Sequence, residues 1–357
     1  MGCKRGTGGF QWKARARSGV QVASTCWMLA CGLWLLGESP LSAESDGSIA
    51  RTPVIDGEWW QVAYSPGLPE IDSEPGQVVD HCFFRAANNK WQLWTQIRGA
   101  AIGRLFYRWE GGKVFEKENW QPKGICWRAD QEHGESWNTG KQEFIHAPYI
   151  SVDNKKYVMY YGGGPSSNTD SCQINAAVSS DGIRFTRFQS PDGLSQIFTG
   201  PGWARDPMVL RVGEKYFFYY CADESGKGVI ALRTSTRPVS DQWTEYQVAS
   251  EGGVLGTHRS SQQCPFVVRL DGYYYLFKMA GSDEYRTAVY RSKSPMSFGT
   301  NDDLLVAVLR SSASEIIRVE NRFYISSLIP GYKGVRVARL RWDPPLPETA
   351  TENSSAN

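Results

Sequence analysis

The sequence of 357 residues predicts an all-β fold, a five-bladed β-propeller, and three observations lead to it. Aromatic residues and glycines are both abundant, with 14 Trp, 17 Tyr, 15 Phe and 36 Gly, which suit pleated surfaces and tight turns. A unit made of a strand, a turn and an aromatic strand recurs along the chain. Its period of roughly fifty to sixty residues is that of one four-stranded propeller blade.

The recurring unit has a fixed internal spacing in its three clearest copies, where an aromatic residue follows a proline by nine positions. These pairs are Pro148 and Tyr157, Pro207 and Tyr216, and Pro265 and Tyr274. A turn segment lies between the two residues of each pair, which predicts a β-hairpin. Two weaker copies begin at residues 80 and 314, so that five copies fill residues 75–342. The alternative is a β-sandwich that contains similar hairpins.

The two ends of the chain differ from this repeat. Residues 1–43 begin with a basic segment, continue with an apolar run over 20–36 and end in a cleavage site of small residues at Leu41-Ser42-Ala43. This pattern predicts a secretion signal. A retained membrane-anchoring helix is the alternative. The propeller domain is predicted over residues 44–343, in a secreted or periplasmic protein. The segment 344–357 is rich in Pro, Thr, Glu and Ser and is predicted to be disordered.

Charge and cysteine content exclude some classes of function. The formal net charge is only +2 and no basic stripe marks the body of the chain, which argues against a nucleic-acid partner. No stable membrane insertion is expected once the signal is removed. Five cysteines follow residue 43, widely spaced and without a CxxC pair, so neither a zinc site nor a disulfide framework is indicated.

The candidate site lies where the hairpins open. The innermost strands of all blades converge on the propeller axis, so residues at the starts of those strands meet at one mouth. Glycoside cleavage needs one carboxyl group that donates a proton and a second that acts as base or nucleophile. Acids, bases and amides at these openings are therefore the candidates, namely Asp80, His81, Glu143, His146, Arg205, Asp206, Gln263, Cys264 and Glu315. Trp203 lies beside them and could stack on a sugar ring.

These openings resemble those of the five-bladed propeller glycosidases of the arabinanase and β-xylosidase type (family 43) and the invertase and levanase type (family 32). The resemblance rests on Asp80 in the first copy, Arg205-Asp206-Pro207 in the third and Gln263-Cys264-Pro265 in the fourth. It implies that Asp80 is the base or nucleophile and that Asp206 orients the sugar, with Arg205 beside it. Gln263 stands where those families carry the glutamate that acts as general acid.

Because Gln263 replaces that glutamate, the sequence leaves open which group donates the proton and whether the protein cleaves sugar. Glu315, Glu143, His146 or His258 could supply the proton, the leaving group could need little acid help, or the protein could bind sugar without cleaving it. The leading prediction is a secreted glycoside hydrolase that acts on an oligosaccharide or polysaccharide. Its predicted catalytic residues are Asp80, Asp206 and Glu315, and its substrate-binding residues are His81, His146, Arg205, Gln263 and Trp203.

Two alternatives belong to other classes of function. The first is a carbohydrate-binding propeller without catalysis, and the second is a scaffold that binds another protein through its rim. The hydrolytic chemistry requires no cofactor. Oxygen ligands that converge in the central channel are compatible with a structural Ca²⁺ there.

Overall fold

The computed structural model describes residues 48–68, 76–113, 115–117, 119–135, 137–138, 142–164, 172–281 and 285–346. The predicted secretion signal lies outside these residues, as does most of the predicted tail. The tail's first residues are described: the carbonyl oxygens of Pro344 and Pro345 accept hydrogen bonds from Arg51, and Leu346 packs on the core. In the described part of the chain, no helix is long and apolar enough to cross a membrane.

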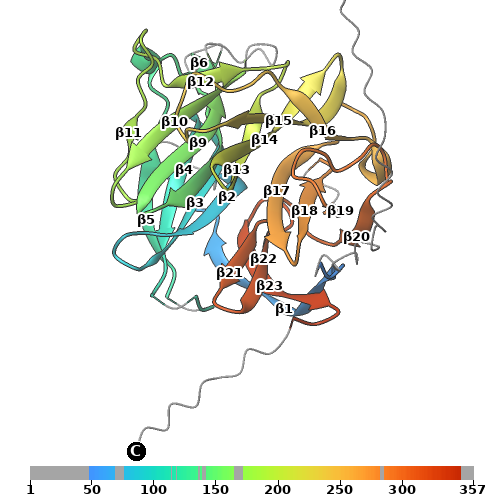
Figure 1. The fold of residues 1–357 in the computed structure, drawn as a ribbon. Helices are drawn as coiled ribbons and strands as arrows, with labels where there is room; N and C mark the ends of the chain where they lie inside the picture. Colours follow the sequence, from blue (N-terminus) through green and yellow to red (C-terminus); the bar gives the residue numbers. More distant parts are fainter. Residues whose placement is uncertain are drawn as a thin grey trace, which may run out of the picture. The chain divides into compact units, whose positions relative to one another are not determined.

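In the described residues, five sheets form a five-bladed β-propeller, which confirms the predicted fold (Figure 1). Blade 1 contains β2 (Gln77–Arg85), β3 (Trp91–Ala100), β4 (Gly103–Glu110), β5 (Gln121–Trp127), β6 (Trp137–Asn138) and β7 (Gln142–Glu143). The strand pairings of the five sheets are antiparallel except for one parallel pairing between β4 and β7 in blade 1. Blade 2 contains β8 (His146–Asp153), β9 (Lys156–Gly163), β10 (Gln173–Ser179), β11 (Thr186–Arg187) and β12 (Gln196–Thr199). Blade 3 contains β13 (Arg205–Val212), β14 (Lys215–Glu224), β15 (Lys227–Ser235) and β16 (Gln247–Glu251).

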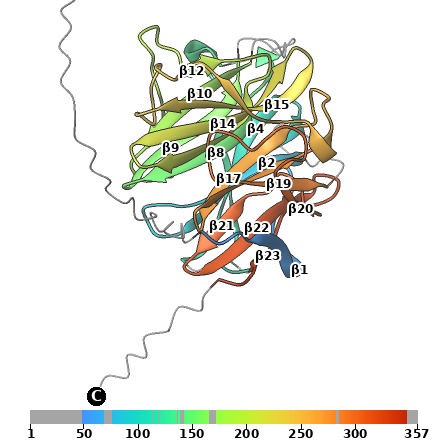
Figure 2. The ribbon, with the colours of Figure 1, turned by 45° about the vertical axis from the view of Figure 1, so that its right-hand side comes forward.

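The last two blades complete the ring. Blade 4 contains β17 (Gln263–Leu270), β18 (Tyr273–Met279), β19 (Thr287–Ser292) and β20 (Leu305–Leu309). Blade 5 contains β21 (Ile316–Val319), β22 (Arg322–Leu328), β23 (Gly334–Asp343) and, as its outermost strand, β1 (Thr52–Tyr64). Short 3₁₀ turns cover Gln131–His133 and Gly253–Leu255. The innermost strands β2, β8, β13, β17 and β21 each form one edge of their sheet. Figure 2 labels β2, β8, β17 and β21 among them.

The chain closes the ring with its first strand, which the sequence repeat did not include. β1 pairs antiparallel with β23, from Thr52 opposite Asp343 to Tyr64 opposite Gly334. Figure 1 shows this as the blue strand beside the red one. The repeat is defined by the proline and the site residues of the inner strands. Because β1 is an outermost strand, it carries neither feature, and the repeat could not predict it.

Among the described residues, the core is divided into five apolar clusters, each between two neighbouring blades. Between blades 2 and 3, for example, the rings of Tyr160 and Phe218 meet edge to face with their centroids 5.1 Å apart. Between blades 4 and 5, Tyr275 meets Trp342 at 4.8 Å. Flat, bulky side chains suit such wedge-shaped interfaces between twisted sheets. The high aromatic content of the sequence therefore serves the packing of blade on blade.

The inner strands of blades 1 to 4 share one irregularity that shapes the site. The pairing with the second strand shifts near the strand start in each of them, for example between Arg205 and Met208 and between Gln263 and Phe266. Asp206 and Cys264 lie in the shift with φ angles of 53° and 48°. A β-bulge of this kind redirects side chains and leaves backbone N–H groups out of the ladder, which explains why proline is accepted there.

Candidate active site

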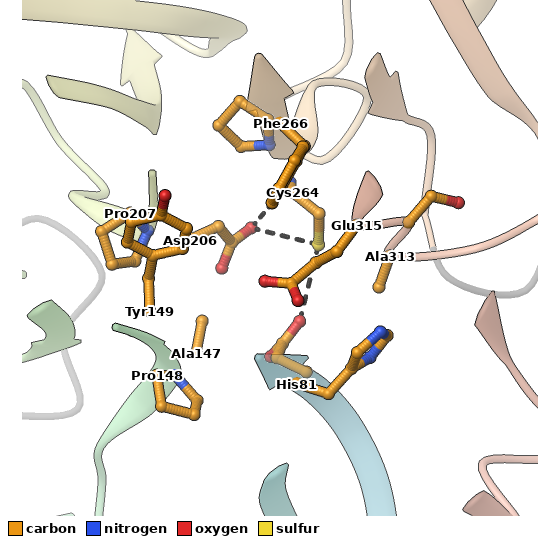
Figure 3. Close-up of a pocket in the computed structure, with 13 residues that line it drawn as sticks. His81, Ala147, Pro148, Tyr149, Asp206, Pro207, Cys264, Phe266, Ala313 and Glu315 are labelled. Atoms are coloured by element: carbon orange, nitrogen blue, oxygen red, sulfur yellow. Dashed lines mark hydrogen bonds between the residues drawn. The ribbon is translucent and has the colours of Figure 1, made fainter. Parts of the chain in front are cut away.

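A small cavity lies on the propeller axis, and all five blades line it (Figure 3). Blade 1 contributes Asp80 and His81, blade 3 Asp206, blade 4 Cys264 and blade 5 Glu315. Blade 2 closes it with residues 147–149. Its volume of about 40 Å³ has room for a few water molecules but not for a sugar ring. The cavity is therefore the floor of the mouth, and a sugar would have to lie above it.

Asp80, Asp206 and Cys264 converge at this floor from three different blades. One carboxylate oxygen of each aspartate and the Cys264 sulfur lie within 4.8 Å of one another. The Cys264 Sγ atom is 3.5 Å from Asp80 Oδ1 and 3.8 Å from Asp206 Oδ2. Dashed lines in Figure 3 mark the contacts between Cys264 and Asp206. The backbone N–H of Cys264 also donates to Asp206 Oδ2 at 3.2 Å. The thiol thus bridges two carboxyl groups that are remote in sequence.

The proximity of the two carboxyl groups changes the protonation of Asp80. Burial and, next, the negative charge of Asp206 raise the pKa of Asp80 from 3.8 to about 7, although Arg205 opposes the shift. Burial also raises the pKa of the Cys264 thiol, and both aspartates add to that effect. Asp80 therefore keeps a proton up to neutral pH, and Cys264 stays a thiol.

Glu315 and His81 line the same cavity and are both uncharged at neutral pH. Burial raises the pKa of Glu315 to about 8, and its Oε2 atom accepts a hydrogen bond of 2.8 Å from the N–H of Phe83. Burial lowers the pKa of His81 to about 3. The Nε2 atom of His81 lies 2.7 Å from the Ser326 hydroxyl oxygen, which fixes the ring against blade 5.

A second set of polar residues lies one position before the bulge in blades 2, 3 and 4. It consists of His146, Arg205 and Gln263, which directly precede Ala147, Asp206 and Cys264. We call these three residues the outer layer. Arg104, at the start of β4, joins it through a hydrogen bond of 2.6 Å between its Nη1 and His146 Nδ1. The Gln263 amide donates to the carbonyl oxygen of Ser260 at 2.7 Å.

The structure thus brings Asp80, Asp206, Glu315 and His81 to one cavity and places three other predicted site residues just outside it. Trp203, which was predicted to bind substrate, contacts two arginines. The guanidinium groups of Arg205 and Arg259 lie 4.0 and 4.4 Å from the centroid of its ring. The indole therefore stacks on cations and positions Arg205.

Two candidates for the missing proton donor lie elsewhere. The carboxylate of Glu143 accepts hydrogen bonds from Arg128 Nε at 2.8 Å and from the N–H of Ala129 at 3.0 Å, so it fixes a loop of blade 1. His258 is exposed and does not line the cavity. Neither residue shares the cavity with Asp80 and Asp206.

Sequence reasoning missed Arg104 and the bridging role of Cys264. Arg104 belongs to the third strand of its blade, where the repeat has no motif, so nothing in the sequence pointed to it. Cys264 did carry a signal. It follows Gln263 as Asp206 follows Arg205, so the repeat assigns the floor position of blade 4 to the cysteine.

The floor residues make a poor Ca²⁺ site. In the described ranges, the group Asp80, Asp206 and Cys264 is the one cluster whose ligand atoms lie close enough to hold a metal ion. Calcium takes six to eight oxygen ligands. This group offers two carboxyl groups, one of them protonated near neutrality, and a thiol. We therefore derive no step through a bound cation.

Comparison with known proteins finds likeness in structure only. No protein-family model and no curated protein sequence matches the chain. Among solved structures, a thermostable family-43 glycoside hydrolase is 14% identical with a TM-score of 0.56, over 78% of this chain and 92% of that one. A family-43 enzyme from Xanthomonas citri, solved with xylose, is 14% identical with a TM-score of 0.52, over 77% and 88%.

A propeller of the second predicted type is also similar. The family-32 β-fructofuranosidase of Bombyx mori is 15% identical with a TM-score of 0.53, over 76% of this chain and 60% of that one. The predicted resemblance to the propeller glycosidases of families 43 and 32 is therefore confirmed at the level of the fold. At these identities the similarity concerns the fold and assigns no role to a residue.

Proposed function

We propose that this protein hydrolyses O-glycosidic bonds in an oligosaccharide or polysaccharide, with Asp80 and Asp206 as its reacting acids. The observation that carries the proposal is the meeting of these two carboxyl groups on the channel axis, with oxygens within 4.8 Å of each other and a proton held on Asp80. The similarity of the fold to that of propeller glycoside hydrolases also supports the proposal.

In the proposed reaction Asp80 is the general acid, because its raised pKa keeps it protonated at neutral pH. The Asp206 carboxylate attacks the anomeric carbon while the Asp80 proton passes to the leaving oxygen. Asp80, now ionised, then takes a proton from the water that releases the sugar from Asp206. The short separation favours this two-step, retaining course, since retaining enzymes place their carboxyl groups about 5–5.5 Å apart and inverting ones about 6.5–9.5 Å.

This assignment differs from the one implied by the family resemblance, which makes Asp80 the base or nucleophile. The reason is Gln263, whose amide cannot act as a general acid and is already bonded to Ser260. Glu315 lines the same cavity and holds its own proton.

The second candidate function is sugar binding without catalysis, and the same Gln263 favours it. A propeller that has lost the glutamate of blade 4 could retain a mouth that recognises sugar. The two functions differ in what Asp80 does: hydrolysis needs its proton, whereas binding survives its replacement by the amide of the same shape.

Sugar release by the purified chain from residue 44 onward separates them. The substrates are arabino-, xylo-, fructo- and galacto-oligosaccharides, and the variants are Asp80→Asn, Asp206→Asn and, as an exposed control, Asp241→Asn. We expect release that falls by about 10³-fold or more in the first two variants and is unchanged in the third. Binding of a panel member without release would instead establish the sugar-binding function.

Export is proposed on the sequence of residues 1–43 alone. A protein expressed with its native N-terminus should be recovered outside the cytoplasm with its first residue at Glu44. Intact mass and N-terminal sequencing of that material test this. Recovery of the full-length chain in the membrane fraction would favour the retained anchor.

A further inference from the structure

The outer layer of the mouth is rich in hydrogen-bond donors and poor in acceptors. Arg104 comes from blade 1, His146 from blade 2 and Arg205 from blade 3. His146 Nε2, Arg205 Nε and the neighbouring Gln96 Nε2 are buried, and no acceptor atom of the described chain meets them. Buried donor groups on three blades are therefore left without an acceptor in the described chain.

The hydrogen bond between Arg104 and His146 determines what His146 offers. A guanidinium N–H can only donate, so the Nδ1 atom of His146 must accept the bond of 2.6 Å. Burial, with Arg104 and Arg205 adding to it, lowers the pKa of His146, so the ring is neutral. The proton of a neutral ring must then sit on Nε2. His146 is thus a donor whose tautomer is set by Arg104.

Gly162 allows these donors to come together. A side chain at this position would place its Cβ atom 3.1 Å from the Cβ of His146 and 3.2 Å from the Cβ of Arg205. Only the absence of a Cβ lets the two strand starts approach so closely. The glycine therefore holds the donors of blades 2 and 3 side by side.

The charges in the mouth are not balanced by the protein. Within the described residues, neither Arg104 nor Arg205 forms an ion pair closer than 4.0 Å with a carboxylate. Asp206 and Asp80 are the nearby counter-charges, and burial and the charge of Asp206 keep Asp80 protonated below about pH 7. Charged groups withdrawn from water are costly unless paired, so a single further negative charge would complete this site.

We propose that the sugar bound at this mouth carries an acidic group, a carboxylate or a sulfate, that Arg104, His146 and Arg205 recognise. The inference rests on the proposed function in that it names the substrate class of the same site. Guanidinium groups bind planar or tetrahedral oxyanions through paired N–H donors, which fits two arginines and a histidine N–H. A neutral sugar would satisfy the donors but leave the positive charge unpaired.

Binding measured by calorimetry on the Asp80→Asn protein, which should not turn over substrate, tests the proposal. The ligands are matched pairs: glucuronate and glucose, galacturonate and galactose, and the 6-sulfates of both hexoses. We expect at least one acidic sugar to bind roughly 10- to 100-fold more tightly than its neutral partner. Comparison of the carboxylate ligands with the sulfate ligands shows which acidic group the site recognises. The preference should shrink as salt is raised.

Variants assign the preference to the outer layer. In Arg104→Gln the acidic sugar should lose its advantage over the neutral one, while Arg318→Gln, an exposed arginine at the far end of β21, should keep it. His146→Gln, which keeps a donor, should retain part of it. Ligand-free thermal unfolding of each variant shows that it is folded. Equal affinity for every acidic and neutral pair, or a preference that Arg104→Gln leaves intact, overturns the proposal.

The outcome is separable from that of the proposed function. Release of neutral sugars by the unmodified protein, together with no preference for acidic ones, would leave hydrolysis standing and remove the acidic substrate. Tight binding of an acidic sugar without release from any matching glycoside would leave the recognition of acidic sugars standing and remove hydrolysis.

Discussion

At the scale of single residues, the proton on Asp80 decides how the site responds to pH. Its pKa of about 7 arises from burial and from Asp206. If Asp80 is the acid, kcat/KM should fall about tenfold per pH unit above that value, because the proton that the leaving oxygen needs is lost. The Asp206→Gln variant, which removes a charge, should lower the pKa of Asp80. A pH profile of hydrolysis that instead rises through pH 7 would make Asp80 the base or nucleophile.

The same residue predicts a pH-dependent stability. A carboxyl whose pKa is higher in the folded than in the unfolded state favours folding at low pH, and that contribution is lost as pH rises from about 4 to about 7. Asp80→Asn should therefore raise the melting temperature at pH 8 and change it little at pH 4. Because Asp80 is partly exposed, the gain should be about 1–2 kcal/mol, or about 2–3 °C for a domain of this size. Thermal unfolding measures it, and Asp241→Asn should show no such pH dependence.

At the scale of elements, the bulge at the start of the inner strands of blades 1 to 4 explains how much of the site could be predicted from the sequence. The repeated proline and aromatic residue predicted the hairpins and brought Asp80, Asp206 and Glu315 to one axis. The repeat also placed Gln263 level with Arg205, whereas the floor of blade 4 belongs to Cys264. Arg104 and β1 could not be predicted, because the outer strands carry no repeated motif and meet their partners only in the closed ring.

The spacing between neighbouring inner strands gives a third prediction. Gly162→Ala would push a methyl group against His146 and Arg205, whose Cβ atoms lie 3.1 and 3.2 Å away. Such overpacking costs about 1–3 kcal/mol of stability, and it should weaken sugar binding by separating the donors. Gly67→Ala is the control, since nothing lies within 4 Å of a Cβ there. Calorimetric binding and thermal unfolding of both variants check it, and an unchanged affinity in Gly162→Ala would contradict it.

At the scale of the whole molecule, the site exists only because the ring is closed. Every blade lines the floor cavity, so any opening of the ring separates Asp80 on blade 1 from Glu315 on blade 5. β1 fastens that junction by pairing along β23, and Val62 and Ala63 from β1 lie in the apolar cluster that joins blade 5 to blade 1. One strand at the start of the domain thus holds together residues more than two hundred positions apart.

Removal of β1 should therefore disrupt the folding of the whole propeller and not only remove one strand from it. A chain that begins at residue 66 would expose the edge of β23 and the apolar cluster beneath β1, and exposed strand edges promote aggregation. We expect it to be poorly soluble and to unfold without a sharp transition, whereas a chain that begins at residue 45 unfolds cooperatively. Removal of residues 347–357 from the other end is the matched control and should change neither property. A soluble, cooperatively folded monomer from residue 66 onward would show instead that the contacts between blades 5 and 1 close the ring without β1.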